Sequence, residues 1–135
     1  MIDWLTGADV LAIHDQLIAE HGGADGIRDV TLLETALARA RQLLAYGQAE
    51  PDIAALAAAY AFGIAKNHAF VDGNKRTSAV VTEAFLRLNG LGLTATDIEI
   101  VQTWSDLGAG LITEPDLIDW LRQKTVKLTE SNVWR

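Results

Sequence analysis

Residues Lys66–Val81 read KNHAFVDGNKRTSAVV and join two segments with helical patterns. The run before them, IAALAAAYAFGIA, is apolar on every side and is typical of a buried helix. Between the two segments, nine residues hold a histidine, a phenylalanine, an aspartate, a glycine, an asparagine, a lysine and an arginine. A connection between helices does not require so many charged and polar groups. We therefore interpret this loop as the candidate functional site, against the alternative of an ordinary loop with surface charges.

Apolar residues recur at helical spacing along most of the chain, which predicts an all-α fold. Capping residues, glycines and prolines mark the boundaries of the helices. We expect one compact domain of about six helices, within residues 6–23, 29–47, 51–68, 74–90, 94–110 and 113–126. The third should begin at Pro51 and be central and buried, because it has no polar face. Strand alternation is absent apart from a short extended piece at residues 2–5.

The same periodicity predicts which side chains face the core and which residues cap the helices. Thr6 with Asp9 has the spacing of a capping box, and Asp29, Thr94 or Thr96, and Thr113 are candidate caps. The expected core positions are Val10, Ile13, Leu17, Leu33, Leu37, Leu44, Val81, Phe85, Leu88, Ile98, Val101, Leu107, Leu117, Trp120 and Leu121.

Composition narrows the class of protein. The 135 residues suit one domain, and the absence of cysteine excludes disulfides and cysteine-based metal sites and fits a reducing cytosol. The amino terminus lacks the basic region of a signal peptide, and the longest apolar run is too short to span a bilayer. We expect a cytoplasmic protein without membrane contact. A net charge of −7 argues against direct nucleic-acid binding, which needs a basic surface.

Positive charge is nevertheless concentrated in the loop. Lys66, Lys75 and Arg76 lie close to His68 in the sequence of an otherwise acidic chain. Such a cluster favours a small anionic ligand over a polyanion. Chance clustering on a solvated surface is the alternative, and charge alone does not separate the two.

The loop also contains the parts of an anion site. A helix that begins near Asn74 presents free backbone N–H groups, and Gly73 before it lets a ligand approach the backbone closely. Cations in a first helical turn are unfavourable next to the helix dipole, so Lys75 and Arg76 there make sense if an anion binds.

Three other residues of the loop complete the prediction. His68 is a candidate general base, because imidazole changes charge near neutral pH. Asp72 offers the oxygen ligands that Mg²⁺ prefers. Phe70 should point inward and hold the loop against the core. A base, a metal carboxylate and a phosphate site together suit phosphoryl or nucleotidyl transfer.

The string HAFVDGNKR resembles the motif of the Fic/Doc (Fido) superfamily, H-x-F-x-D/E-x-N-G/K-R. Asn-Lys-Arg is the version typical of the Doc ("death on curing") branch, although Doc proteins usually have alanine where Gly73 stands. The resemblance extends to GIRD and LLETAL before the motif and FLRLNGL after it. It covers roughly residues 3–125, which we assign to one Fido domain, and leaves residues 126–135 as a tail. The motif residues are His68, Phe70, Asp72, Gly73, Asn74, Lys75 and Arg76.

This resemblance implies a function. Doc toxins transfer the γ-phosphate of ATP to a hydroxyl of a translation factor, elongation factor Tu, with Mg²⁺, and a Phd-like antitoxin restrains them by folding a disordered C-terminal segment onto the toxin. By position, His68 would deprotonate the target hydroxyl and Asp72 would hold Mg²⁺ or position the attacking group. The phosphates would lie on Gly73, Asn74, Lys75 and Arg76. The inhibitory string of many Fic enzymes, S/T-x-x-x-E-G/N, is absent from the sequence, which is consistent with restraint by a separate chain.

Two alternatives remain open. Fic-type transfer of AMP to a protein hydroxyl is favoured by Gly73, but the second motif glycine of the AMP transferases is Lys75 here and their proline is Ala69. A lysine at that position would fill the space that an α-phosphate with its nucleoside needs. A catalytically silent Fido domain that only binds a partner is the other alternative, and the intact motif argues against it.

Residues outside the motif give weaker signals. Arg28 and Lys66 are possible accessory residues. Arg28 could reach a phosphate or the target protein, although we favour a structural contact with a neighbouring aspartate that orders the loop. We interpret His14 as a half-buried packing residue of the first helix and His21 as a favourable charge near its end, and neither as a metal ligand. Antitoxin docking could use exposed tryptophans among Trp4, Trp104, Trp120 and Trp134, although Trp104 and Trp120 are expected in the core.

Overall fold

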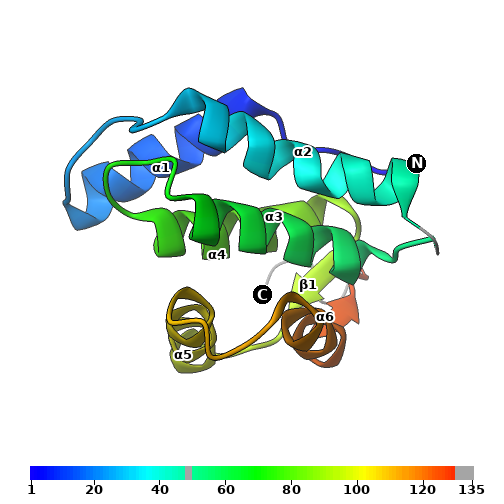
Figure 1. The fold of residues 1–135 in the computed structure, drawn as a ribbon. Coiled ribbons are helices and arrows are strands. Elements are labelled where there is room, and N and C mark those ends of the chain that lie inside the picture. Colours follow the sequence, from blue (N-terminus) through cyan, green and yellow to red (C-terminus); the bar gives the residue numbers. More distant parts are fainter. Residues whose placement is uncertain (48–49, 130–135) are drawn as a thin grey trace.

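The computed structural model describes residues 1–47 and 50–129, so the expectation for Trp134 and most of the predicted tail lies outside the described residues. The described part contains six helices and two short strands (Figure 1), as the all-α prediction expects. The elements are α1 Gly7–His21, α2 Val30–Tyr46, α3 Ile53–Asn67, α4 Asn74–Leu88, β1 Leu91–Leu93, α5 Asp97–Gly108, α6 Glu114–Gln123 and β2 Thr125–Lys127.

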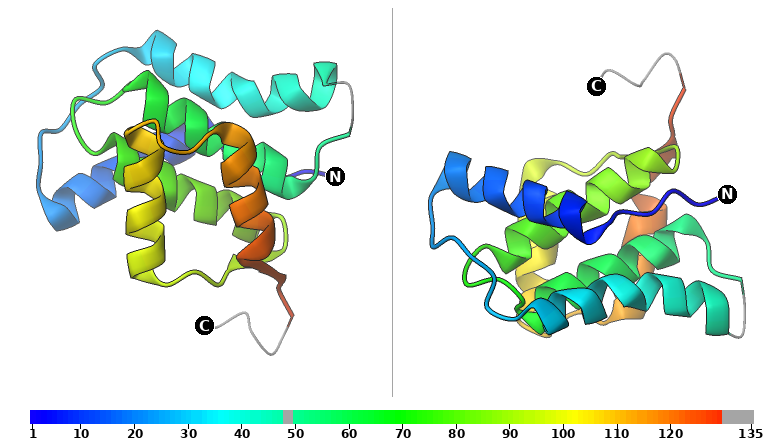
Figure 2. Two further views of the ribbon diagram at one scale, coloured as in Figure 1. Left: turned by 60° about the horizontal axis from the view of Figure 1, so that its bottom comes forward. Right: turned by 90° about the horizontal axis from the view of Figure 1, so that it is seen from above.

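Helix α3 lies at the centre of the molecule, as its uniformly apolar sequence predicts. It packs against α2 and α4, and α5 and α6 cover it from the side opposite α2 (Figures 1 and 2). Small residues make the α2–α3 contact close: a Cβ atom placed at Gly63 would lie 3.0 Å from the Cα atom of Ala36. The alanines of α3 thus let neighbouring backbones approach, and the larger side chains fill the space beyond them.

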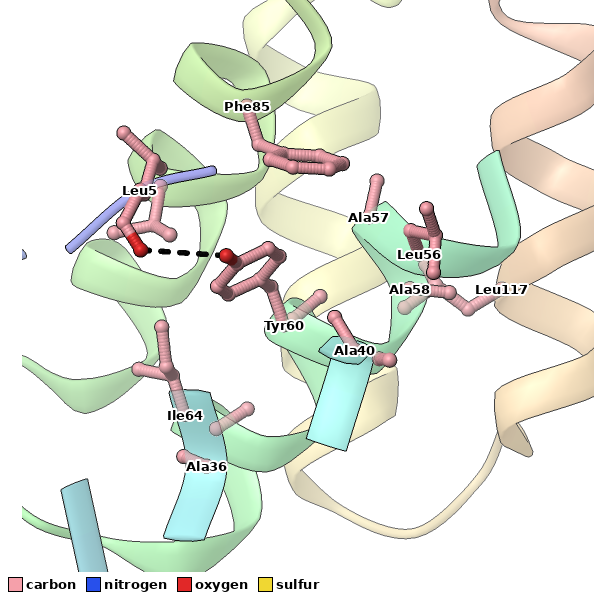
Figure 3. Packing of buried hydrophobic residues seen from close by; sticks show 14 of the residues in the cluster. Leu5, Ala36, Ala40, Leu56, Ala57, Ala58, Tyr60, Ile64, Phe85 and Leu117 are labelled. Carbon is pink, nitrogen blue, oxygen red and sulfur yellow. Dashed lines mark hydrogen bonds between the residues drawn. The ribbon is translucent and has the colours of Figure 1, made fainter. Parts of the chain in front are cut away.

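Tyr60 of α3 lies beside Phe85 in the core (Figure 3). Its ring lies 4.8 Å from the Phe85 ring and 6.4 Å from the Trp4 ring, between centroids. Its buried hydroxyl donates to the backbone oxygen of Leu5 at 3.3 Å, which satisfies the polar end of the side chain. Burial raises the Tyr60 pKa above its usual value. This contact holds the amino-terminal segment against α3.

Side-chain capping explains where five of the six described helices begin. Thr6 with Asp9, Thr96 with Glu99, and Thr113 with Asp116 form capping boxes. Asp29 caps α2 as predicted. The expected start of α3 at Pro51 is wrong by two residues, because Asp52 caps the helix and accepts a hydrogen bond from the Ala55 N–H.

The strand pair is a feature that the sequence patterns did not predict. Residues 91–93 pair antiparallel with residues 125–127, so the fold continues past the domain end expected at residue 125. Three-residue strands are too short for a recognisable alternation of apolar and polar residues. At the other end, residues 1–6 have no regular secondary structure, so the extended piece at residues 2–5 is not a strand.

Several expected core positions are on the surface. Ile98 is 82% exposed, Val101 70%, Leu88 49% and Leu44 37%. In α5 the core contacts come instead from Trp104 and Leu107, which are buried. The periodicity predicted the helix correctly but not the face that its neighbours cover.

No helix in the described ranges is long and apolar enough to cross a membrane.

Candidate functional site

The motif loop begins where α3 ends, at His68. This residue has φ 52° and ψ 48°, a left-handed conformation that turns the chain out of the helix. Arg28 holds the turn, since its Nε donates to the His68 oxygen at 2.8 Å and its Nη2 to the Asn67 oxygen at 3.2 Å. The Arg28 guanidinium is therefore used in a structural contact, although its acceptors are backbone carbonyls and not the expected aspartate.

The α1–α2 connection runs beside the motif loop (Figure 1). The N–H of Arg28 donates to the Ala69 oxygen at 2.7 Å, and the Val71 N–H donates to the Gly26 oxygen at 3.1 Å. These backbone hydrogen bonds join segments that lie about forty residues apart in the chain. The loop is consequently supported along one edge.

Two motif residues form the inner side of the loop. Phe70 is 1% exposed, which confirms that it points into the core. The Asn74 side chain accepts from the Phe70 N–H and donates to the Phe70 oxygen, each at 3.0 Å. The amide of Asn74 thus binds the loop itself, and the residue would meet a ligand through its backbone N–H.

Helix α4 begins without a side-chain cap. Its N-cap residue is Gly73, which has a φ of 77°. Residues other than glycine adopt this backbone conformation only at an energetic cost. The N–H groups of the first turn, from Asn74 to Arg76, therefore remain available, together with the positive end of the helix dipole. This is the geometry that the sequence predicts for an anion site.

Asp72 precedes this helix start and is exposed. Its Oδ1 accepts from the Gly73 N–H at 2.8 Å, and its Oδ2 accepts from the Ala24 N–H at 3.2 Å. Each carboxylate oxygen keeps a further lone pair. Because Mg²⁺ commonly takes one or two carboxylates and completes its shell with water and phosphate, the carboxylate fits a magnesium ligand.

A groove of about 920 Å³ brings the predicted residues together. Its lining includes His68, Asp72, Gly73, Asn74, Lys75 and Arg76. Apolar side chains of three helices form its walls, among them Leu17, Ile18, Val80, Val101 and Trp104. Glu83 and Asp97 add negative charge on another part of the lining. A base, a carboxylate, two cations and an uncapped helix end thus face one space that is large enough for a nucleotide.

The two suggested accessory residues do not line this groove. Lys66 lies elsewhere: its Nζ is 5.7 Å from the centroid of the Phe62 ring and 3.9 Å from a Cβ atom placed at Gly110. With Arg28 bound to backbone carbonyls, the positive charge in the groove comes from Lys75 and Arg76. Of the four residues that cluster in the sequence, His68, Lys75 and Arg76 line the groove and Lys66 does not.

Two residues that the sequence patterns did not indicate, Gly108 and His14, support the site. The Lys75 stem passes over the end of α5, where a Cβ atom at Gly108 would lie 2.8 Å from its Cδ. His14 is buried and not half-buried, and its Nε2 is 2.8 Å from the Asp72 oxygen. Both contacts join distant parts of the chain, so no local pattern could have revealed them.

Comparison with known proteins identifies a family and two relatives. A model of the Fic/DOC family matches residues 4–86. The chain is 41% identical over 96 residues to "Toxin Doc" of Mycolicibacterium smegmatis, which covers 70% of this chain and 71% of the relative. It is 30% identical over 115 residues to "Protein kinase doc" of Escherichia phage P1, and this match covers 85% of this chain and 90% of the relative. By its sequence, its helical fold and these relatives, the chain belongs to the Fic/DOC family.

Proposed function

We propose that this protein is the toxin of a toxin–antitoxin pair and transfers the γ-phosphate of ATP to a protein hydroxyl. The observation that carries the proposal is that His68 and the uncapped start of α4 line the same groove. A general base and an oxyanion site in one groove are the requirements of phosphoryl transfer, which depends on positioning and charge stabilisation. The names of the two relatives, a toxin and a protein kinase, support the same assignment.

In this proposal each group has one task. The His68 imidazole takes the proton of the target hydroxyl while the oxygen of that hydroxyl forms a bond to the γ-phosphorus. The bond between the γ-phosphorus and ADP breaks, and ADP departs. The first-turn N–H groups of α4, with Lys75 and Arg76, hold the phosphate oxygens. Asp72 would hold Mg²⁺, which neutralises phosphate charge when bound.

Transfer of phosphate is preferred over transfer of AMP for two reasons. The positive φ of Gly73 accounts for glycine at that position, so it need not signal room for an α-phosphate. Lys75 occupies the position of the second motif glycine of AMP transferases, and its stem is held against α5. A Lys75→Gly variant should move the activity toward AMP transfer if the lysine excludes the nucleoside sterically.

The target and the antitoxin follow from the family resemblance. We propose a translation factor like elongation factor Tu as the substrate, and a Phd-like antitoxin whose C-terminal segment folds onto this chain. Among the candidate docking tryptophans, Trp104 is buried, and Trp4 packs against the Phe85 ring at 6.0 Å between centroids. Trp104 therefore offers no docking side chain, and Trp4 is only partly exposed.

Mass spectrometry of elongation factor Tu after incubation with this protein, ATP and Mg²⁺ tests the proposal. The expected result is a gain of one phosphate on a Ser or Thr that is lost in a His68→Asn variant. A gain of the mass of AMP would replace the proposal with nucleotidyl transfer. If elongation factor Tu gains nothing, a lysate is labelled with ATP carrying the label on the α- or the γ-phosphate. Labelling of another protein would correct the target, and no labelling at all would indicate a silent binder.

A further inference from the structure

Three potential metal ligands meet between the middle of α1 and the connection from α1 to α2. His14 and Asp15 are neighbours on α1, and Asp25 comes from the connection to α2. One ligand atom of each residue lies within 4.8 Å of the others. The His14 side chain is 1% exposed, whereas the two aspartates are exposed. The cluster thus combines one buried nitrogen ligand with two exposed carboxylates.

The orientation of the His14 ring is determined by its surroundings. Its Nε2 lies 2.8 Å from the backbone oxygen of Asp72, and a carbonyl oxygen only accepts hydrogen bonds. Nε2 must therefore carry the proton, which leaves the lone pair of the neutral ring on Nδ1. The ring stacks on Phe70 with centroids 3.8 Å apart and planes 8° apart. Burial, stacking and the hydrogen bond together hold Nδ1 in one direction.

That direction is toward the carboxylate of Asp15. Nδ1 lies 3.8 Å from the Asp15 Oδ1, which is beyond hydrogen-bonding distance. A lone pair that faces a negative carboxylate at this distance is unfavourable unless a cation lies near it. A histidine whose second nitrogen donates to a carbonyl is the usual arrangement of a metal ligand, because that hydrogen bond sets the tautomer and the ring orientation.

We propose that His14, Asp15 and Asp25 bind a divalent transition-metal ion such as Zn²⁺, at a site separate from the magnesium ligand Asp72. A nitrogen with two carboxylates suits Zn²⁺ better than Mg²⁺. In a tetrahedral zinc site with ligands at about 2 Å, the ligand atoms lie about 3.4 Å apart. The carboxylates must therefore close in by roughly an ångström, which exposed side chains do by rotation, and water would complete the shell.

The ion would also support the motif loop. Asp72 receives two contacts from the neighbourhood of this site: its backbone oxygen lies against His14, and its carboxylate accepts from the Ala24 N–H, next to Asp25. An ion at Nδ1 strengthens the Nε2–H donor and ties the α1–α2 connection to α1. Metal binding is therefore expected to stabilise the loop that holds Asp72. This inference stands apart from the transferase proposal, because it concerns the binding of an ion to the free protein.

The test is titration of the untagged, chelator-treated chain with Zn²⁺ by calorimetry, and with Co²⁺ followed by visible absorption. The expected result is one tight equivalent of Zn²⁺, with the absorption bands of a Co²⁺ ion that has nitrogen and oxygen ligands. The double variant Asp15→Asn/Asp25→Asn should bind the first equivalent at least about tenfold more weakly. This variant keeps His14 and its contact with the loop.

The matched control is the double variant Glu20→Gln/Glu34→Gln, which removes the same charge from exposed positions of α1 and α2. Glu20 lies beside His21, with 3.9 Å between their Oε2 and Nε2 atoms, so the control also removes a two-residue His–Glu pair. Its first-equivalent affinity should stay within about twofold of the parent chain. Absence of a tight equivalent, or equal losses in both double variants, would overturn the proposal. Loss in Asp72→Asn with retention in the Asp15/Asp25 variant would assign the ion to the motif groove and overturn it too.

Discussion

The side-chain amide of Asn74 hydrogen-bonds both backbone polar groups of Phe70, each at 3.0 Å. The first residue of α4 thus closes the motif loop in front of it. Asn74→Ala should lower the free energy of unfolding by about 1 to 3 kcal/mol, since two partly buried hydrogen bonds are lost. Chemical denaturation measures the difference. Asn74→Asp, which keeps the acceptor but loses the donor, should fall between the parent and Asn74→Ala, and equal stability of all three would contradict the role of this contact.

His68 should be required for activity but not for folding. Its left-handed backbone makes alanine a poor test, because asparagine tolerates φ 52° better. His68→Asn is expected to lower the transfer rate by about a hundred- to ten-thousand-fold, the usual contribution of a general base. Its thermal midpoint should stay close to that of the parent. Full toxicity of this variant in cells would remove His68 from the mechanism.

Asp72 should mediate the dependence on Mg²⁺. Asp72→Asn preserves an acceptor oxygen for a loop N–H but loses the charge, so nucleotide affinity with Mg²⁺ present should fall at least about tenfold. Without Mg²⁺ the parent and the variant should bind nucleotide with similar affinity. Calorimetric titration under both conditions makes the comparison. An equal change under both would show that Asp72 acts on the loop and not on the ion.

Gly108 should matter because it leaves room for the Lys75 stem. A Cβ atom there would lie 2.8 Å from the Lys75 Cδ, so Gly108→Ala should displace the flexible lysine without disturbing the backbone. We expect nucleotide binding to weaken several-fold, while stability holds or rises by up to about 1 kcal/mol because alanine favours the helix. In a Lys75→Met background the Gly108→Ala change should have little effect on binding. If Gly108→Ala weakened nucleotide binding as much in the Lys75→Met background as in the parent chain, the effect would not act through Lys75.

The pH dependence of stability should reveal the contact between Glu99 and Lys124. The lysine Nζ lies 2.6 Å from the carboxylate and, with the Thr96 N–H, lowers the Glu99 pKa from 4.5 to about 2. A group whose pKa is lower in the folded state stabilises that state at pH values above its pKa in the unfolded state. This stabilisation is lost as the pH falls through the pKa of the folded state. Glu99→Gln should therefore lower the thermal midpoint at neutral pH, and the difference should disappear between pH 4.5 and about 2. A difference that is constant over this range would contradict the assignment.

Local physical chemistry explains what the sequence predicted well. Thr6, Asp29 and Thr113 cap the helices expected of them, because a cap bonds to N–H groups only two or three residues away. The third helix is buried as expected, since a helix without a polar face has no side to expose. The motif residues from His68 to Arg76 were predicted together because they are contiguous.

Contacts between distant segments determined the rest. Ile98 and Val101 have helical spacing but no neighbour covers them, and periodicity identifies a stripe without saying what packs on it. Lys66 is close to the motif in sequence, yet α3 carries it away from the groove. The clasp of Arg28 on the His68 turn, the space at Gly108 and the meeting of His14 with Asp25 all join different elements. The amino-acid sequence alone predicts which groups the loop offers for chemistry and where most of the helices begin, because those interactions are local. Which of those groups line the groove and which support its shape depends on packing between distant segments, so it becomes visible in the three-dimensional structure.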